Sequence, residues 1–261
     1  MDDIEHLIDT NNFQRINLHE AEKAELMQRT DSKFIVPTAL SKEILGNIGS
    51  HYFIVENNGQ VIPEYISDYF DTSDLSMYLA HQNKRSKRYK VRVRNYSATG
   101  DSFLEIKIRV PPGKTIKKRI STTSNELEQA STTEFIASKS PYLPNSLSKI
   151  LQTRFNRLTL VAKDFQERVT LDFNLHLTAT APEHSIQLDD ICVVEVKRSK
   201  VKLDSKISGL LKSLGIRKVG FSKYSIGCAL LYTSVKQNNF KRILLYLKKI
   251  RNEYAEPNSA S

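Results

Sequence analysis

The sequence predicts an α+β fold in which strands with one apolar and one ionic face close into a barrel that helices cover from outside. The first observation is a period of two: in the segment 88–94 every second residue is Arg or Lys, and the residues between them are apolar or aromatic. This period is typical of a β-strand that places all its cations on one face. The second observation is that at least six segments show such an alternation, so a closed barrel would gather their ionic faces into one channel.

The basic residues are concentrated in the segment 84–119, which holds thirteen Lys and Arg against two acidic residues. Since the whole chain carries a net charge of +10, this segment accounts for the basic balance of the protein. Like charges at this density repel one another and persist where a polyanion neutralises them. Nucleic acid, anionic lipid and phosphate compounds could all be the anionic partner of this segment. The chain shows no nucleic-acid-binding motif and few aromatic residues among the cations, which disfavours specific binding of nucleic acid.

The predicted strands follow from the same alternation along the chain. Pro111-Pro112-Gly113 separates two of them and predicts the turn of a hairpin. The stretch from Asp68 to Thr72 is interpreted as a further strand that ends in an Asx-type turn, with a structural role. The segments with an apolar and an ionic face are 29–36, 88–94, 104–110, 116–120, 155–160, 168–175 and 194–197.

Helices are fewer than strands. Asn17 and Glu20 form the pattern of a capping box, which predicts the start of the first helix. The last helix has an apolar stripe and basic residues elsewhere. We expect it to plug or cover one end of the channel, although such a helix could instead meet a membrane or a partner. The predicted helices are 18–28, 39–48, 124–139, 145–152, 204–214 and 237–253.

We expect one domain over residues 1–236, with residues 237–261 forming the amphipathic C-terminal helix, packed on or capping the channel, and a disordered tail from Pro257. No apolar run is long enough for a transmembrane helix, and the acidic N-terminus lacks the core of a signal peptide. The two cysteines have no metal-type spacing, which favours a reducing environment. We therefore expect a cytoplasmic protein.

Eight short segments, in this order, resemble the VTC domain, the polyphosphate-polymerase branch of the triphosphate tunnel metalloenzymes (CYTH-like superfamily). The resemblance spans most of the chain and implies an eight-stranded antiparallel tunnel with peripheral helices. It also implies that Arg and Lys bind a triphosphate and that a carboxylate binds a divalent metal, manganese or magnesium. The segments are Arg29-Thr-Asp-Ser-Lys33-Phe34, Asp68-Tyr-Phe-Asp71-Thr72, Lys90-Val-Arg92-Val-Arg94, Leu104-Glu105-Ile-Lys107, Phe155-Asn-Arg157, Arg168-Val-Thr-Leu-Asp172, Val194-Glu195-Val-Lys197 and Phe221-Ser222-Lys223-Tyr224.

The resemblance also implies roles for individual residues. Glu195 resembles the metal ligand of the family, and Ser222 a hydroxyl contact to phosphate. Lys117 is a further candidate phosphate ligand, although Lys118 or Arg119 could take that role instead. Lys197 would either contact phosphate or balance the charge of Glu195. The candidate catalytic residues are Arg92, Arg94, Lys107 and Lys223, and the phosphate ligands implied by the motifs are Lys33, Arg92, Arg94, Lys107, Arg157, Arg168 and Lys223.

The acidic residues allow a second interpretation. The role of Glu195 and Glu105 could be limited to charge pairing inside the channel, with Lys197 and Lys107 respectively. For Asp31 and Asp172, pairing with neighbouring Arg is the favoured role.

The sequence departs from related families at defined points. Related CYTH proteins begin with E-x-E-x-K, whereas this chain has Arg29, Asp31 and Lys33 at that spacing, as in the polymerase branch. Phe155 stands where a Tyr is common, and Gly220 where a further Lys can occur.

The preferred function implied by the resemblance is synthesis of inorganic polyphosphate, in which the terminal phosphoryl group of ATP passes to a phosphate or polyphosphate acceptor. The expected partners are ATP and inorganic polyphosphate or pyrophosphate. Guanidinium and ammonium groups suit this chemistry, because phosphoryl transfer needs mainly positioning and neutralisation of charge. The alternatives are a tripolyphosphatase or nucleoside triphosphatase that uses water as acceptor, and a non-catalytic module that binds polyphosphate. A membrane protein is a possible partner for export of the product.

Overall fold

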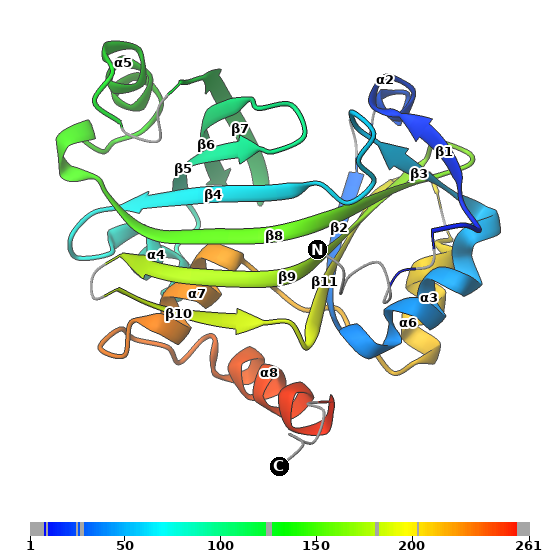
Figure 1. The fold of residues 1–261 in the computed structure, drawn as a ribbon. Helices are drawn as coiled ribbons and strands as arrows, with labels where there is room; N and C mark the ends of the chain where they lie inside the picture. Colours follow the sequence, from blue (N-terminus) through cyan, green and yellow to red (C-terminus); the bar gives the residue numbers. More distant parts are fainter. Residues whose placement is uncertain are drawn as a thin grey trace, which may run out of the picture.

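The computed structural model describes residues 8, 10–24, 26, 29–123, 127–180, 183–202 and 204–254. Their central element is a curled sheet of eight strands in the order β2-β11-β9-β8-β4-β5-β6-β7, in which all neighbours are antiparallel (Figure 1). The strands are β2 (Arg29–Pro37), β4 (Glu64–Asp71), β5 (Arg88–Tyr96), β6 (Ser102–Val110), β7 (Lys114–Ser121), β8 (Ser148–Ala162), β9 (Glu167–Thr180) and β11 (Ile191–Ser199).

Three short strands extend this sheet at its margins. β3 (Tyr52–Glu56) pairs with β8, and β1 (Gln14–Asn17) pairs with β3 in parallel. β10 (Glu183–Leu188) pairs with β9. The sequence alternation predicted none of these three strands, because they lie outside the ionic faces.

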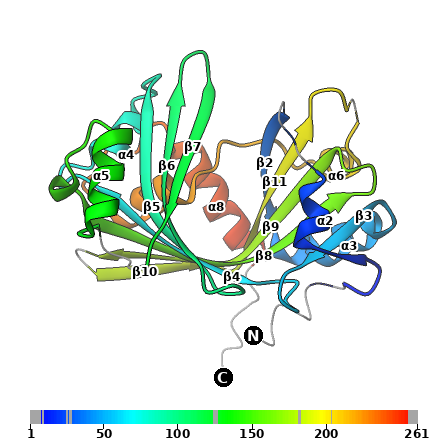
Figure 2. The ribbon, with the colours of Figure 1, turned by 90° about the horizontal axis from the view of Figure 1, so that it is seen from above.

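The sheet curls into a half-barrel, which confirms the predicted eight-stranded antiparallel tunnel fold. Figure 2 shows β5, β6 and β7 on one side and β2 and β11 on the other. The expectation of full closure is corrected, since in the described part of the chain the edge strands β2 and β7 do not pair with each other. Both edges carry lysine and arginine, and like charges on facing edges disfavour strand pairing.

The apolar faces of the strands point outward and are covered by helices, as predicted. α3 (Ser41–Ile48) and α6 (Lys206–Ser213) pack over the outer faces of β2, β9 and β11, where Ile44, Leu45 and Leu211 are fully buried. α5 (Ala130–Lys139) covers β5 and β6 through Ile136. α2 (Leu18–Glu22) lies near β1 and β3 (Figure 1).

Two helices occupy the concave side of the sheet at one end. α7 (Lys223–Leu231) is buried along most of its length and packs against Leu151 of β8 and Leu177 of β9. α8 (Lys241–Tyr254) joins the same core through Ile243, Leu247 and Ile250. Figure 2 shows α8 between the two walls of the half-barrel. Among the described residues, no helix has both the length and the apolar character needed to cross a bilayer.

The helix predictions are partly confirmed. α3, α6 and α8 lie within one to four residues of the expected bounds, and Asn17 and Glu20 form the predicted capping box of α2. The helix expected at 145–152 is wrong, because β8 begins at Ser148 and pairs with β4 and β9 from there on. α2 and α5 are shorter than expected, and residues 25, 27, 28 and 124–126 lie outside the described residues, as does the tail predicted to be disordered.

The stretch from Asp68 to Thr72 has the predicted structural role. Asp71 ends β4, and its carboxylate accepts hydrogen bonds from the backbone N–H groups of Thr72, Met77 and Tyr78, at 2.8, 2.9 and 3.0 Å. It thereby satisfies N–H groups at the start of α4 (Ser76–Gln82), a helix that the sequence patterns did not predict. The predicted hairpin turn at Pro111-Pro112-Gly113 connects β6 and β7, and its Gly113 has a φ of 109°.

Candidate functional site

The charged side chains meet on the concave face because the strand registers align them. Residues directly opposite each other on neighbouring strands place their side chains on the same face. Lys90 lies opposite Lys107, and Lys107 lies opposite Lys117. On the far wall Lys33 lies opposite Glu195. The period of two in the sequence therefore becomes a continuous ionic lining of the half-barrel.

Glu105 is the centre of the first ionic cluster. Its carboxylate accepts hydrogen bonds from Arg92, at 2.8 Å from Nε and 2.5 Å from Nη2, and pairs with Lys117. Burial alone would raise the pKa of Glu105, but Arg92 and Lys117 lower it to about 2. Glu105 therefore serves as a buried counter-ion for two cations, and Lys107 is not its partner.

Asp172 is the centre of the second cluster. Arg157 donates two hydrogen bonds to its carboxylate, at 2.6 and 2.8 Å, and Lys223 pairs with the same group. The ammonium of Lys223 also lies 4.1 Å from the centre of the Phe155 ring. Burial outweighs the attraction of Asp172 and lowers the pKa of Lys223 to about 8. The predicted pairing of Asp172 with an arginine is thus present, and Lys223 at the first turn of α7 shares it.

Glu195 is the centre of the third cluster and is bound less tightly. Its carboxylate lies 3.2 Å from Lys33 Nζ and 3.9 Å from Lys197 Nζ. Burial would raise the pKa of Glu195, but these two lysines lower it to about 2, so it is ionised at neutral pH. Its side chain is 15% exposed, against 2% for Glu105 and 3% for Asp172. Of the three carboxylates, Glu195 is therefore the one most open to a ligand.

Three further cations, Lys90, Arg94 and Lys107, face the same space without a carboxylate at salt-bridge distance among the described residues. Lys90 donates a hydrogen bond of 2.5 Å to the hydroxyl of Ser222, and Arg94 donates one of 2.9 Å to Ser67. Burial, together with Lys107 and other nearby cations, lowers the pKa of Lys90 well below its usual value. Burial and neighbouring arginines lower the pKa of Arg94 to about 10. Positive charge in the tunnel is therefore only partly neutralised by the protein itself.

Aromatic rings form part of the lining between these clusters. The guanidinium of Arg157 lies 5.1 Å from the ring centre of Tyr65 and 5.2 Å from that of Phe155, which stack on each other. Tyr69 accepts a hydrogen bond of 3.0 Å from Arg92. Burial would raise the pKa of Tyr69, but Arg92 and Arg94 lower it. These rings hold the arginines in fixed orientations.

Most of the residues singled out in the sequence come together, with two exceptions. Arg168 lies on the ionic face but at the end beneath α2, where it donates a hydrogen bond of 2.5 Å to the carbonyl of Ala21. Lys118 lies opposite Ile106 on the apolar face. Its rivals point into the tunnel: Lys117 pairs with Glu105, and Arg119 covers the ring of Phe103 at 4.6 Å.

Sequence reasoning missed Lys90, Tyr65 and Tyr69 as site residues. Lys90 has the same parity as Arg92 and Arg94, so the alternation itself could have included it. The two tyrosines alternate along β4 with Ser67 between them, on the face that meets Arg92 and Arg94 of β5. The second role of Ser222 was also missed, because its hydroxyl caps α7 by accepting a hydrogen bond from the Ser225 N–H.

The tunnel offers little to a metal ion by itself. No cluster of three or more His, Cys, Asp or Glu side chains occurs among the described residues. Glu195 supplies one ionised and partly accessible carboxylate. Magnesium in phosphate-binding sites is typically bound by one or two carboxylates together with phosphate oxygens of the ligand. The donor set therefore fits a divalent ion that arrives with a phosphate ligand.

The model of the VTC domain family matches residues 28–232. No curated protein matches the sequence.

Several solved structures are similar to this chain at low identity, each with a TM-score below 0.5. HpAC1 from Hippeastrum, for which a dominant triphosphatase activity is described, is 13% identical with a TM-score of 0.47, and the match covers 77% of this chain and 96% of that one. The structural-genomics target VpR19 from Vibrio parahaemolyticus is 11% identical with a TM-score of 0.44, covering 74% and 94%. A Pyrococcus horikoshii protein is 11% identical with a TM-score of 0.44, covering 76% and 97%.

Proposed function

Because the chain belongs to the VTC domain family, we propose that it is a polyphosphate polymerase, which transfers the terminal phosphoryl group of ATP to a growing chain of inorganic polyphosphate. The observation that carries the proposal is the arrangement of cations in the tunnel. Within the described part of the chain, Lys90, Lys107 and Arg94 face the space without carboxylate partners at salt-bridge distance, while Arg92 and Arg157 are held by Glu105 and Asp172. Such a lining suits a linear polyanion that carries charge on every unit.

The proposed role of each cation depends on how firmly the protein holds its side chain. Arginines fixed by two hydrogen bonds to a buried carboxylate can orient phosphate oxygens without losing their proton. Lys33, Lys107 and Lys223 would neutralise the charge that develops on the leaving diphosphate. Ser222, at the N-terminus of α7, would direct its hydroxyl and the adjacent N–H groups toward a phosphate oxygen.

Glu195 would hold a divalent cation together with the phosphate oxygens of ATP. When bound, such an ion neutralises phosphate charge and favours departure of the diphosphate. Lys33 and Lys197, which now bind the carboxylate, would then turn to the phosphates. Manganese and magnesium both prefer oxygen ligands.

The proposal is tested by incubating the purified protein with ATP and manganese, with and without a pyrophosphate primer. We expect ADP and phosphate chains that grow with time on a gel. Free orthophosphate without chains would show a triphosphatase that uses water as acceptor. Binding of tripolyphosphate without turnover of ATP would show a non-catalytic polyphosphate-binding module. Either result would overturn the polymerase assignment.

A further inference from the structure

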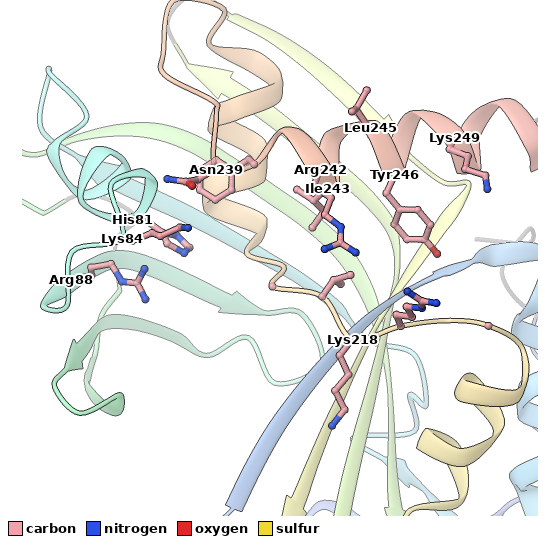
Figure 3. Close-up of a pocket in the computed structure, with 15 residues that line it drawn as sticks. His81, Lys84, Arg88, Lys218, Asn239, Arg242, Ile243, Leu245, Tyr246 and Lys249 are labelled. Atoms are coloured by element: carbon pink, nitrogen blue, oxygen red, sulfur yellow. The ribbon is translucent and has the colours of Figure 1, made fainter.

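A second basic cavity lies outside the ionic lining of the tunnel. It has a volume of about 660 Å³ and lies between α8, the end of α4 with the start of β5, and the segment 215–220 that precedes α7 (Figure 3). Six of its lining residues are cationic, and none of its described lining residues is Asp or Glu. The cations are Lys84, Arg88, Arg217, Lys218, Arg242 and Lys249.

Most of these cations have no partner of opposite charge in the part of the chain that the structure describes. Within the described residues, Lys249 pairs with Glu253 at 3.5 Å, whereas the other five make no ion pair. This differs from the tunnel, where three carboxylates neutralise part of the charge. The pKa of His81, which also lines the cavity, is lowered to about 3 by burial and by Lys90, Arg88 and Arg109. The electrostatic potential of the cavity is therefore strongly positive.

The cavity adjoins the tunnel, because the two share residues of β5 and of the segment that precedes α7. Arg88 lines the cavity, and on β5 it shares the ionic face of Lys90 and Arg92. Gly220 also lines the cavity, and two residues later Ser222 accepts the hydrogen bond from Lys90. On the other side, the N–H of Val219 donates a hydrogen bond of 2.8 Å to the carbonyl of Lys33. Figure 3 places Lys218 next to β2 and Arg88 on the opposite wall.

We propose that this cavity binds the part of a linear polyphosphate chain that lies beyond the tunnel, so that one chain is held at both places. The inference rests on the proposed function for its ligand. A chain of phosphates is narrow and charged on every unit, so it can pass from the tunnel along Arg88 to the cations of α8. Phe240, Ile243 and Tyr246 add apolar walls to the cavity, and low-dielectric walls focus the field of the cations that line a cleft.

The arrangement favours such a chain over other polyanions. The cations lie on three walls around one half-open cavity, whereas a membrane surface would need them on one flat or convex face. Single-stranded nucleic acid would need aromatic platforms on which its bases can stack. Among the described lining residues, only three carry rings: His81, Phe240 in the turn before α8, and Tyr246 in α8.

The test compares two double variants on the same helix. Arg242→Gln with Lys249→Gln removes two charges from the cavity, while Lys241→Gln with Lys248→Gln removes two exposed charges of α8 that do not line it. Affinity is measured for tripolyphosphate and for inorganic polyphosphate of defined long chain length, at two salt concentrations. A third variant, Lys84→Gln with Lys218→Gln, removes charge from the other two walls and leaves α8 intact.

We expect the first and third variants to bind tripolyphosphate like the wild type and to lose about tenfold in affinity for the long chain, with a shallower salt dependence. The control variant should resemble the wild type with both ligands. Equal long-chain affinities in all variants would overturn the inference. So would a wild type that binds the long chain no more tightly than tripolyphosphate, or cavity variants that lose binding only to single-stranded DNA or phosphatidylserine vesicles.

Failure of this inference and failure of the proposed function are distinguishable. If the wild type binds both phosphates but forms no polymer from ATP, the polymerase assignment fails, and the cavity is still judged by the affinities. If the wild type forms polymer while the cavity variants keep full long-chain affinity, the cavity assignment alone fails.

Discussion

Each of the three carboxylates at the centre of the tunnel is bound by two cations, and this pattern decides what a substitution does. A buried carboxylate without partners would be costly, and so would a buried cation. Arg92 and Glu105 satisfy each other, as do Arg157 and Asp172. Arg94, by contrast, is only 7% exposed and is hydrogen-bonded to the neutral hydroxyl of Ser67. Arg92 and Arg94 of β5 therefore have different roles in the folded protein.

The first prediction separates these two arginines. Arg94→Ala should weaken tripolyphosphate binding by roughly 1.5–3 kcal/mol, the range for hydrogen bonds to charged groups, with little change in Tm. Arg92→Ala should weaken binding as well, but it should also lower Tm, because Glu105 keeps only Lys117 as a partner. Calorimetry and thermal unfolding measure the two effects. Equal Tm losses in both variants would contradict the assignment of Glu105 as the counter-ion of Arg92.

The second prediction concerns Glu195, the carboxylate most open to a ligand. Glu195→Gln keeps the shape of the side chain but removes the charge that would hold a divalent cation. Affinity for a non-hydrolysable ATP analogue in the absence of metal should persist or rise, because a negative group has left the tunnel. ADP release with manganese should fall by about two orders of magnitude or more, because charge on the leaving group is no longer stabilised.

The matched control for Glu195 is Glu105→Gln, which removes the charge of a nearly inaccessible counter-ion. It should lower Tm and leave the dependence of activity on manganese concentration unchanged. Full activity of Glu195→Gln would exclude this residue as the metal ligand. Collapse of folding and binding together would instead assign it only to charge balance for Lys33 and Lys197.

Among the elements, the strands of the ionic face were predictable from the sequence, and the helices near the site were less so. The alternation in 88–94, 104–110 and 194–197 has a period that only a strand satisfies, and β5, β6 and β11 lie there. β8 was partly misassigned, because Ser148–Leu151 follows Pro144 and has no alternating charge. Its pairing with β4 and β9 decides its conformation.

α7 could not be predicted from periodicity, because it is apolar around most of its circumference and buried.

For the charge pairs inside the tunnel, the sequence predicted that they would form but not which residues would be partners. The sequence indicated that acids would pair with neighbouring bases, but the partner of Glu105 is Arg92 on the next strand and not Lys107 on its own. The cavity beside α8 was not predictable at all, since its cations come from three separate segments.

The third prediction concerns the contact that positions α7. A Cβ on Gly227 would lie 2.6 Å from a methyl carbon of Leu151 on β8, so Gly227→Ala must displace the helix or the leucine. Overpacking of this kind costs about 1–3 kcal/mol of the free energy of unfolding. Because Ser222 and Lys223 begin the same helix, tripolyphosphate affinity should fall as well.

Gly46→Ala in α3 is the control for this contact, because a Cβ there meets no atom within 4 Å. It should raise the free energy of unfolding by about 0.5–1 kcal/mol and leave affinity unchanged. Denaturant unfolding and calorimetry measure both variants. A stable Gly227→Ala variant with normal affinity would show that α7 can shift without disturbing the site.

At the scale of the whole molecule, the half-barrel holds many like charges close together. Helices cover its outer faces, α7 and α8 occupy one end of its concave side, and strong local cores hold each wall. The free energy of these apolar cores offsets the electrostatic repulsion in a tunnel whose positive charge is only partly neutralised. One consequence is that burial lowers the pKa of Lys90 and Lys223 in the tunnel.

The last prediction uses this consequence to measure protonation on binding. Burial and nearby Arg157 lower the pKa of Lys223 to about 8, with Asp172 acting in the opposite direction and Lys33 adding to the decrease. A bound polyphosphate stabilises the ammonium and raises this pKa. At about pH 8.5 binding should therefore take up protons, and affinity should fall as the pH rises through 8. Lys90, whose pKa is also lowered by burial, should contribute in the same direction.

The free energy of unfolding should rise with pH over the range in which the affinity for polyphosphate falls. Between about pH 8 and 10.5 the folded chain binds fewer protons at Lys223 than the unfolded chain, so this residue makes stability rise with pH in that window. Calorimetry in two buffers of different ionisation enthalpy measures the proton uptake, and Lys223→Arg should reduce it because guanidinium does not titrate there. Uptake that is zero in the wild type, or unchanged in this variant, would mean that Lys223 is fully protonated before the ligand binds, and that Asp172 compensates its burial completely.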